Sequence, residues 1–197
     1  MLILEYIINV FKYLPLVYLL KLRRMDICNI KCHCEIKKKF LNEFIISFKH
    51  KGYKQFPSFE VFKVGDYSFV CYYSGYVNIT GLKKVNEIEI ALFTLKKLLR
   101  NTFLEFENVV IDNITAKCCC IVPRQICLQR KREKIESELK DKIKSIKYER
   151  EIFPNMFIKT KYSTLIWSSN NKVSCVGLKN IVHIKKLCKL IKKIEAI

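Results

Sequence analysis

The sequence predicts an α+β fold made of two copies of one unit, in which helices cover an antiparallel sheet. Three observations predict it. Segments with strand-like alternation lie between segments with helical spacing. Short runs of aromatic and β-branched residues are separated by turn residues. Residues 77–83 (VNITGLK) recur as residues 173–179 (VSCVGLK). We expect the two copies to form one pseudo-symmetric sheet backed by helices.

The first copy is expected to begin with a half-buried strand at residues 29–36. There, Ile30, Cys32, Cys34 and Ile36 alternate with polar residues. Apolar residues at helical spacing predict a helix over residues 36–50. Three strands joined by Gly65-Asp66 and Ser74-Gly75 turns follow, and then a second helix. These last elements are expected at residues 59–64, 68–73, 76–80 and 85–100.

The second copy repeats this order. A strand at residues 113–118 is followed by a long charged helix over residues 126–147. The remaining strands are expected at residues 157–160, 163–168 and 172–176, with a last helix from Asn180. We therefore divide the chain into an apolar extension (1–24), a first repeat (25–105) and a second repeat (106–197), and the two repeats form one domain (25–197).

Charge predicts a polyanionic partner. The 197 residues include 37 Lys and Arg against 18 Asp and Glu, a formal net charge of +19. Half of the residues are hydrophobic, and only 5 are Gly and 4 Pro, which excludes a disordered or collagen-like chain.

Residues 1–24 allow two interpretations. The segment is strongly apolar, but Glu5 and Lys12 interrupt it and Pro15 breaks its middle. A charge near the bilayer centre costs about 2.5–3.5 kcal/mol on insertion scales. We expect an amphipathic extension packed on the body or on a partner, and a membrane is not the expected partner. The alternative is a membrane-tethered basic protein.

The ten cysteines fall in irregular clusters, which favours a reducing, intracellular setting over a disulfide scaffold. Thiolates and imidazole are zinc ligands, so Cys28, Cys32, His33 and Cys34 with Cys118, Cys119 and Cys120 form an alternative metal cluster. The strand pattern points most of these cysteines into the core and no CxxC pair exists, so we expect neither metal nor cofactor. No catalytic motif occurs, and we expect the protein not to be an enzyme.

Residues 148–154 (YEREIFP), 165–169 (LIWSS) and 172–179 (KVSCVGLK) resemble the second repeat of the TATA-box-binding protein family. The family pattern there is Y-E-P-E-L-F-P, L-I-F-V-S-G and K-I-V-L-T-G-A-K. The first copy is similar through Phe56, residues 72–75 and residues 80–83. The resemblance covers residues 25–197.

This resemblance implies a saddle: one curved antiparallel sheet of pseudo-twofold symmetry, with helices on the convex face. The concave face would lie on the minor groove of A·T-rich promoter DNA, where aromatic wedges unstack base steps and bend the duplex. The implied function is transcription initiation in the nucleus, or in the cytoplasmic factory of a large DNA virus. The protein would bind double-stranded DNA as a monomer and recruit initiation factors.

The resemblance also implies roles for single residues. The wedges are Phe56, Tyr72, Phe153 and Trp167, although Phe56 and Phe153 would otherwise be interpreted as core aromatics. The groove-contacting amides are Asn29 and Asn113, with strand capping as the alternative. Val70 and Leu165 match apolar residues of the floor, and Thr80 and Val176 match threonines of the family. Lys159 matches an arginine that contacts backbone phosphates. Its counterpart in the first repeat is Phe62 or Lys63.

The chain departs from the family where valines line the floor, and these departures put TATA preference in doubt. The valine positions are occupied by Lys31, Asn78, Thr115 and Ser174, and His33 and Lys117 replace small hydroxyl residues. We hypothesise that the amide carbonyl of Asn78 accepts from guanine N2 and relaxes A·T selectivity. The alternative function is an interaction module that keeps the fold, lacks TATA specificity and binds a protein partner or nonspecific DNA.

Two surfaces are candidates for protein partners. Glu149, Glu151 and Ile152 match residues that the family presents to general transcription factor IIB, although Arg150 replaces a proline between the glutamates. The lysines of the last helix are either a docking face for acidic partners or its solvated side. These are Lys185, Lys186, Lys189, Lys192 and Lys193.

Overall fold

The computed structural model describes residues 25–49, 58–118 and 124–197. Within these residues, nine strands form one sheet in the order β2-β3-β4-β1-β5-β9-β8-β7-β6, accompanied by four α-helices. The predicted α+β class and the single sheet are confirmed. The apolar extension and the wedge candidate Phe56 lie outside the described residues.

The chain divides into two compact units, which we call the first unit (Ile27–Thr115) and the second unit (Ala116–Ile197 with Met25 and Asp26). Their boundary falls inside β5, later than the expected boundary at residue 105. The reason is that β5 lies beside β1 in the sheet, so most of its length belongs with the first unit.

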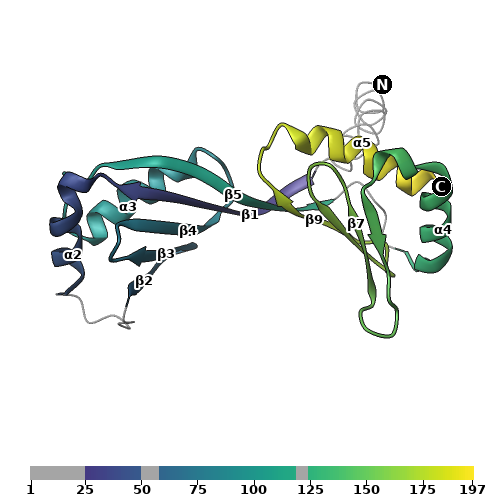
Figure 1. The fold of residues 1–197 in the computed structure, drawn as a ribbon, viewed down its shortest axis with the longest axis horizontal. Helices are drawn as coiled ribbons and strands as arrows, with labels where there is room; N and C mark the ends of the chain where they lie inside the picture. Colours follow the sequence, from purple (N-terminus) through teal and green to yellow (C-terminus); the bar gives the residue numbers. More distant parts are fainter. Residues whose placement is uncertain (1–24, 50–57, 119–123) are drawn as a thin grey trace, which may run out of the picture. The chain divides into compact units, whose positions relative to one another are not determined.

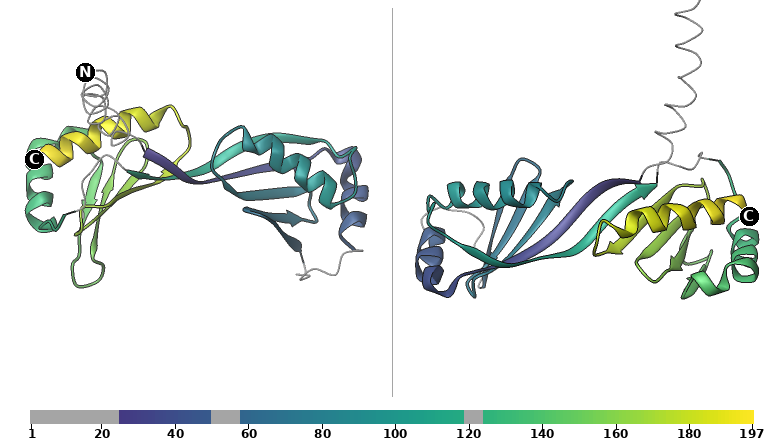
Figure 2. Two further views of the ribbon diagram at one scale, coloured as in Figure 1. Left: turned by 180° about the vertical axis from the view of Figure 1, so that it is seen from behind. Right: turned by 90° about the horizontal axis from the view of Figure 1, so that it is seen from above.

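The first unit contains strands β1 to β4, most of β5 and two α-helices. Figure 1 shows α3 lying along one face of its strands, and Figure 2 shows the same arrangement from above. The elements are β1 (Met25–Ile36), the short 3-10 helix η1 (Lys38–Phe40), α2 (Leu41–Lys49), β2 (Phe59–Val64), β3 (Tyr67–Tyr72), β4 (Tyr76–Leu82), α3 (Glu87–Leu98) and β5 (Phe106–Cys118).

The core of this unit lies between the strands and the helices. As the alternation predicts, Ile30, Cys32, Cys34 and Ile36 are buried along β1. Phe44 of α2 and Ile88, Ala91 and Leu95 of α3 are buried as well. Among the described residues, no three His, Cys, Asp or Glu side chains form a group that could hold a metal ion. His33 lies on the opposite face of β1 from Cys32 and Cys34, so the three side chains cannot converge on one ion.

The second unit repeats the order of helix, antiparallel strands and helix, and its β6 has no counterpart in the first unit. Its elements are α4 (Leu128–Glu138), the 3-10 helix η2 (Lys140–Lys142), β6 (Ser145–Lys147), β7 (Asn155–Lys159), β8 (Thr164–Ser168), β9 (Val173–Leu178) and α5 (His183–Ala196). Leu187, Ile191 and Ile194 of α5 are fully buried, and Figure 1 shows this helix along one face of the strands.

The prediction of one long helix over residues 126–147 is wrong. The helix ends at Glu138, and the chain then forms η2 and β6. Ile146 of β6 pairs with Ile158 of β7, so β6 supplies hydrogen-bond partners to a strand that would otherwise be an edge of the sheet. None of the described helices has the length and apolar character needed to cross a membrane.

Both hairpin sets use the same register. Cys71 pairs with Val77 in the first unit as Trp167 pairs with Val173 in the second. Likewise, Phe59 pairs with Tyr72 as Asn155 pairs with Ser168. The duplication read in the sequence is therefore also a duplication of strand pairing.

Candidate nucleic-acid interface

Each unit has one strand face that packs on its helices and one that does not, which we call the open face. Side chains on the open face are partly exposed, whereas their neighbours are buried along β2 to β4, along β7 to β9 and along β1 from Ile30 onward. In the first unit the open face carries the predicted residues Asn29, Lys31, His33, Lys63, Val70, Tyr72, Asn78, Thr80, Asn113 and Thr115.

A row of rings crosses the open face of the first unit. The Phe59 and Tyr72 ring centroids are 5.5 Å apart, and Tyr72 and Tyr76 follow at 5.9 Å. His33 stacks on Tyr76 at 4.9 Å. Burial raises the pKa of the Tyr76 hydroxyl, and the nearby Asp112 carboxylate adds to the rise. Tyr72, predicted as a wedge, is thus held between two other rings rather than standing alone.

The neighbouring row is more polar. Val61 pairs with Val70, Val70 with Asn78, and Asn78 with His33, so four strands contribute to it. At its end, His33 Nδ1 lies 2.7 Å from Asp112 Oδ1 of β5. Asp112 was not among the predicted residues, because strict alternation from buried Ile114 would have placed it on the core side.

The two predicted groove amides are both engaged locally. Asn29 Oδ1 accepts a hydrogen bond from the backbone N–H of Gly81 at 2.7 Å. Asn113 Nδ2 donates to Thr115 Oγ1 at 3.5 Å. The bond to Gly81 is a structural role for Asn29, as in the alternative of strand capping. It uses only the carbonyl oxygen of the side-chain amide.

Lys63 and Lys159 occupy equivalent positions in the two units. Lys63 pairs with Ser68, which pairs with Thr80. Lys159 pairs with Thr164, which pairs with Val176. This register selects Lys63 over the buried Phe62 as the counterpart of Lys159, and both lysines are exposed.

In the second unit an aromatic pair lies at the start of β7. The Phe153 and Phe157 ring centroids are 5.3 Å apart, and Phe153 is 46% exposed. Phe157 pairs with Ile166, and Ile166 with Ser174, so this row is more apolar than its counterpart in the first unit. Sequence reasoning missed Phe157 and Ile166. Lys117, also predicted, is exposed on β5.

Trp167 is not an exposed wedge, and that prediction is wrong. The side chain is fully buried, its Nε1 donates to Asn171 Oδ1 at 2.8 Å, and Lys131 Nζ lies 5.0 Å from the ring centroid. Leu165 is buried on the same face, so it is not a floor residue either. Ser168 is the residue that corresponds to Tyr72.

The reason is a motif match that was one residue out of step. The hairpin closes with Ser168 opposite Lys172, and Trp167 pairs with Val173 as Cys71 pairs with Val77, so Trp167 is equivalent to the buried Cys71. A shift of one residue moves every side chain of a strand to the other face relative to its motif. The offset between residues 77–83 and 173–179 was visible in the sequence and could have identified Ile166 as the floor residue equivalent to Val70.

The predicted partner residues lie on a turn before β7. The Ile152 and Phe153 backbone N–H groups both donate to the Glu149 carbonyl oxygen, at 3.0 and 2.8 Å. Glu149 and Glu151 are exposed, and Ile152 is 77% exposed. The turn therefore presents an aliphatic side chain flanked by two carboxylates.

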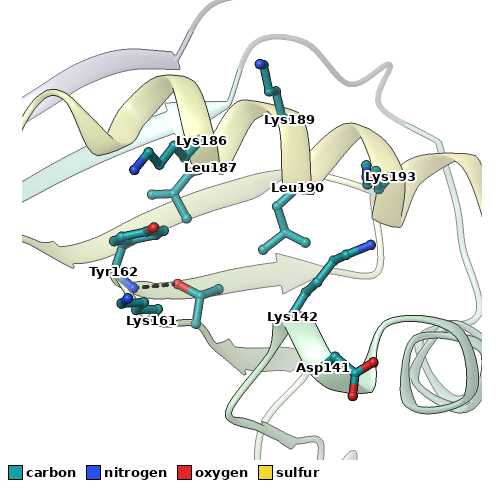
Figure 3. A pocket seen from close by; sticks show the side chains of 10 residues that line it. Asp141, Lys142, Lys161, Tyr162, Lys186, Leu187, Lys189, Leu190 and Lys193 are labelled. Atoms are coloured by element: carbon teal, nitrogen blue, oxygen red, sulfur yellow. Dashed lines mark hydrogen bonds between the residues drawn. The ribbon is translucent and has the colours of Figure 1, made fainter.

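A pocket of about 370 Å³ lies on the helix side of the second unit. Figure 3 shows Leu187 and Leu190 of α5 directed into it, with Lys142 reaching in from the opposite side. Tyr162 forms one wall, where its ring stacks on His183 at 4.3 Å. The other basic residues of the lining are Lys161, Lys186, Lys189 and Lys193.

Among solved structures, the chain is similar to TBP from Methanococcus jannaschii, with a TM-score of 0.65 and 21% sequence identity. The match covers 88% of this chain and 99% of that one. Heterotetrameric sarcosine oxidase from Corynebacterium sp. U-96 is a much weaker match, with a TM-score of 0.28 and 7% identity, and says nothing about this fold. No family model and no curated protein matches the chain. The structure thus has a TBP-like fold.

Proposed function

We propose that this protein is a non-enzymatic transcription initiation factor that binds double-stranded promoter DNA in the minor groove and bends it. The observation that supports this proposal is a TBP-like fold in which the strand faces away from the helices carry both aromatic rings and exposed lysines. In the proposed cellular setting it acts in the nucleus, or in a cytoplasmic viral factory.

The aromatic pairs are suited to act as wedges. The minor groove is only about 6 Å wide, so a sheet face can occupy it only if the duplex is opened and kinked. Rings inserted between base steps cause such kinks. The proposed wedges are Tyr72, supported by Phe59, in the first unit and Phe153, supported by Phe157, in the second.

Lysines near these rings supply the attraction to DNA. Lys63 and Lys159 lie exposed at equivalent positions of the open faces. Each phosphate that a cation neutralises releases counterions, so affinity should fall steeply with salt. The formal net charge of +19 acts in the same direction over longer distances.

Protein partners are proposed for two surfaces. The turn with Glu149, Glu151 and Ile152 would bind a factor similar to transcription factor IIB, because exposed aliphatic and acidic groups lie together there. A second candidate function, as a protein-interaction module, is favoured by the pocket of Figure 3. Its apolar floor and five lysines fit an acidic segment with one bulky apolar side chain.

The test combines binding with bending. Fluorescence anisotropy with a duplex of about 20 base pairs measures affinity at several salt concentrations, and energy transfer between dyes at the duplex ends measures the bend. We expect Tyr72→Ala and Phe153→Ala to reduce the bend while retaining most of the salt-dependent affinity. Phe103→Ala is the matched control, since Phe103 is 80% exposed and precedes β5.

The proposal fails if no duplex binds at low salt. It also fails if both open-face variants bend DNA like the native protein. Lys189→Glu changes the pocket of Figure 3 and tests the second candidate function. It should lower DNA affinity only as much as a change of two charge units on any surface does. Binding of an acidic partner peptide should be abolished.

A further inference from the structure

We propose that Asp112 makes the open face of the first unit select G·C base pairs in the minor groove, through a hydrogen bond from the guanine N2 amino group to its carboxylate. This inference rests on the proposed DNA binding. It names a base preference opposite to the one that the family resemblance implies.

The position of Asp112 follows from its bond to His33. His33 is opposite Asn78 on the open face, and its Nδ1 lies 2.7 Å from Asp112 Oδ1. The carboxylate therefore continues the row that begins at Val61 and passes through Val70 and Asn78. In this row His33 lies between Asn78 and Asp112. Base edges that lie along the row and contact Asn78 would therefore pass close to the Asp112 carboxylate.

The carboxylate keeps capacity for a further bond. Its side chain is 30% exposed, and His33 engages only one of its oxygens. A carboxylate has about four lone-pair sites and, when ionised, is solely an acceptor.

The chemistry of the minor groove then decides the preference. A·T and T·A pairs present only acceptors there, adenine N3 and thymine O2, whereas G·C pairs add the N2 amino donor. An acceptor-only group facing A·T would leave two acceptors opposed and desolvated, which is unfavourable. Facing G·C, the same carboxylate forms a charge-assisted hydrogen bond.

Nearby cations reduce the repulsion between Asp112 and DNA phosphates. Lys31 lies on the same face of β1 as His33, two residues earlier. The other open-face acid near this row is Glu35, whose Oε2 accepts from Asn108 Nδ2 at 3.0 Å. Glu35 is also a carboxylate, but it pairs with Tyr76 rather than Asn78 and so lies in a different row. It therefore provides a control for the effect of negative charge alone.

The experiment varies only the minor-groove amino group. Four duplexes share one sequence design: an A·T site, the same site with 2,6-diaminopurine in place of adenine, a G·C-containing site, and that site with inosine in place of guanine. Diaminopurine adds the N2 amino group and inosine removes it. At one fixed salt concentration, we expect the native protein to bind each amino-bearing duplex about tenfold more tightly than its partner lacking the group.

Asp112→Asn and Glu35→Gln each remove one negative charge from this face. Asp112→Asn should flatten the ranking to within about twofold, because the amide offers donors as well as an acceptor. Glu35→Gln should raise affinity for all four duplexes alike. Circular dichroism checks that both variants are folded. The order of the native protein's affinities for the four duplexes tests the inference even if neither variant folds.

The outcomes separate the two proposals. If no duplex binds, the proposed function and this inference both fail. If the duplexes bind equally, or if A·T and inosine duplexes bind more tightly, DNA binding stands and the inference is overturned. It is also overturned if Asp112→Asn and Glu35→Gln change all four affinities by the same factor.

Discussion

Asn29 Oδ1 accepts a 2.7 Å hydrogen bond from the backbone N–H of Gly81, where the pairing of β1 and β4 shifts register. Between Ile30 and Cys32 on β1, the partners move from Leu82 to Ile79, so β4 contains a bulge. A bulge leaves a backbone N–H without its partner in the strand ladder, and the Asn29 side chain replaces that partner.

Asn29→Ala should therefore destabilise the protein by about 1–3 kcal/mol, because the part-buried N–H of Gly81 is left unsatisfied. Urea unfolding measures the change. Asn86→Ala is the control, since the Asn86 side chain makes no capping bond to α3, and it should cost less than about 0.5 kcal/mol. Equal midpoints for the two variants would contradict the role given to Asn29.

Gly81 and Gly177 provide a matched pair for backbone conformation. Both have positive φ, +94° and +81°. A Cβ at Gly81 would lie 1.9 Å from the Asp66 carbonyl oxygen, whereas a Cβ at Gly177 meets no described heavy atom within 4 Å. We expect Gly177→Ala to cost about 1–2 kcal/mol from the left-handed conformation alone. Gly81→Ala should cost a further 1–3 kcal/mol or so, because the strand must move; similar costs in urea unfolding would argue against the clash.

Trp167 is the sole tryptophan of the chain, so its fluorescence reports on one site. Because the ring is fully buried and bonded to Asn171, its emission should be blue-shifted in the native protein and resist quenching by iodide. Saturating DNA should leave this emission unchanged. A large change on DNA addition would mean that β8 has the opposite face toward DNA.

Truncating the same side chain tests its structural role. Trp167→Ala should destabilise the protein by about 3–5 kcal/mol, as expected for loss of a large buried aromatic side chain. Phe103→Ala is the control for an exposed ring and should cost less than about 1 kcal/mol. Thermal unfolding followed by circular dichroism measures both.

The buried cysteines should be unreactive. Burial raises the pKa of Cys32 to about 11 and that of Cys34 to about 12, and it also raises the pKa of Cys71. Only thiolates react rapidly with alkylating reagents. Brief labelling at pH 8, mapped by mass spectrometry, should modify exposed Cys127 and leave these three unmodified until urea is added. Their rapid labelling in the native protein would contradict the burial.

The same thiols make stability depend on pH. The unfolded chain releases the Cys34 proton near pH 9, whereas the folded chain holds it to about 12. Stability from this group is therefore fully present below pH 9 and decreases as the pH rises from 9 toward 12. The urea midpoint should fall over the accessible part of this range, and less steeply in Cys34→Ala. An unchanged slope in that variant would show that other groups cause the fall.

Alternation and repetition in the sequence were sufficient for the order of the strands in the first copy, for all strands of the second copy except β6, and for most of the core. They placed Cys32 and Cys34 inside and Lys31 and His33 on the open face, because in a regular strand side-chain direction depends only on position. Motif similarity was less dependable. It placed Trp167 on the open face, because the motif match was one residue out of step with the strand pairing, in which Trp167 is equivalent to the buried Cys71.

The sequence by itself determined the α+β class, the duplication and the identity of every described strand except β6, since these depend on local periodicity. Only the tertiary structure decided where α4 ends, that β6 pairs with β7 and that Asp112 meets His33. Each of these depends on pairing between segments far apart in the chain. A register shift or a bulge of a single residue there changes the direction of side chains without changing the local pattern that predicts the strand.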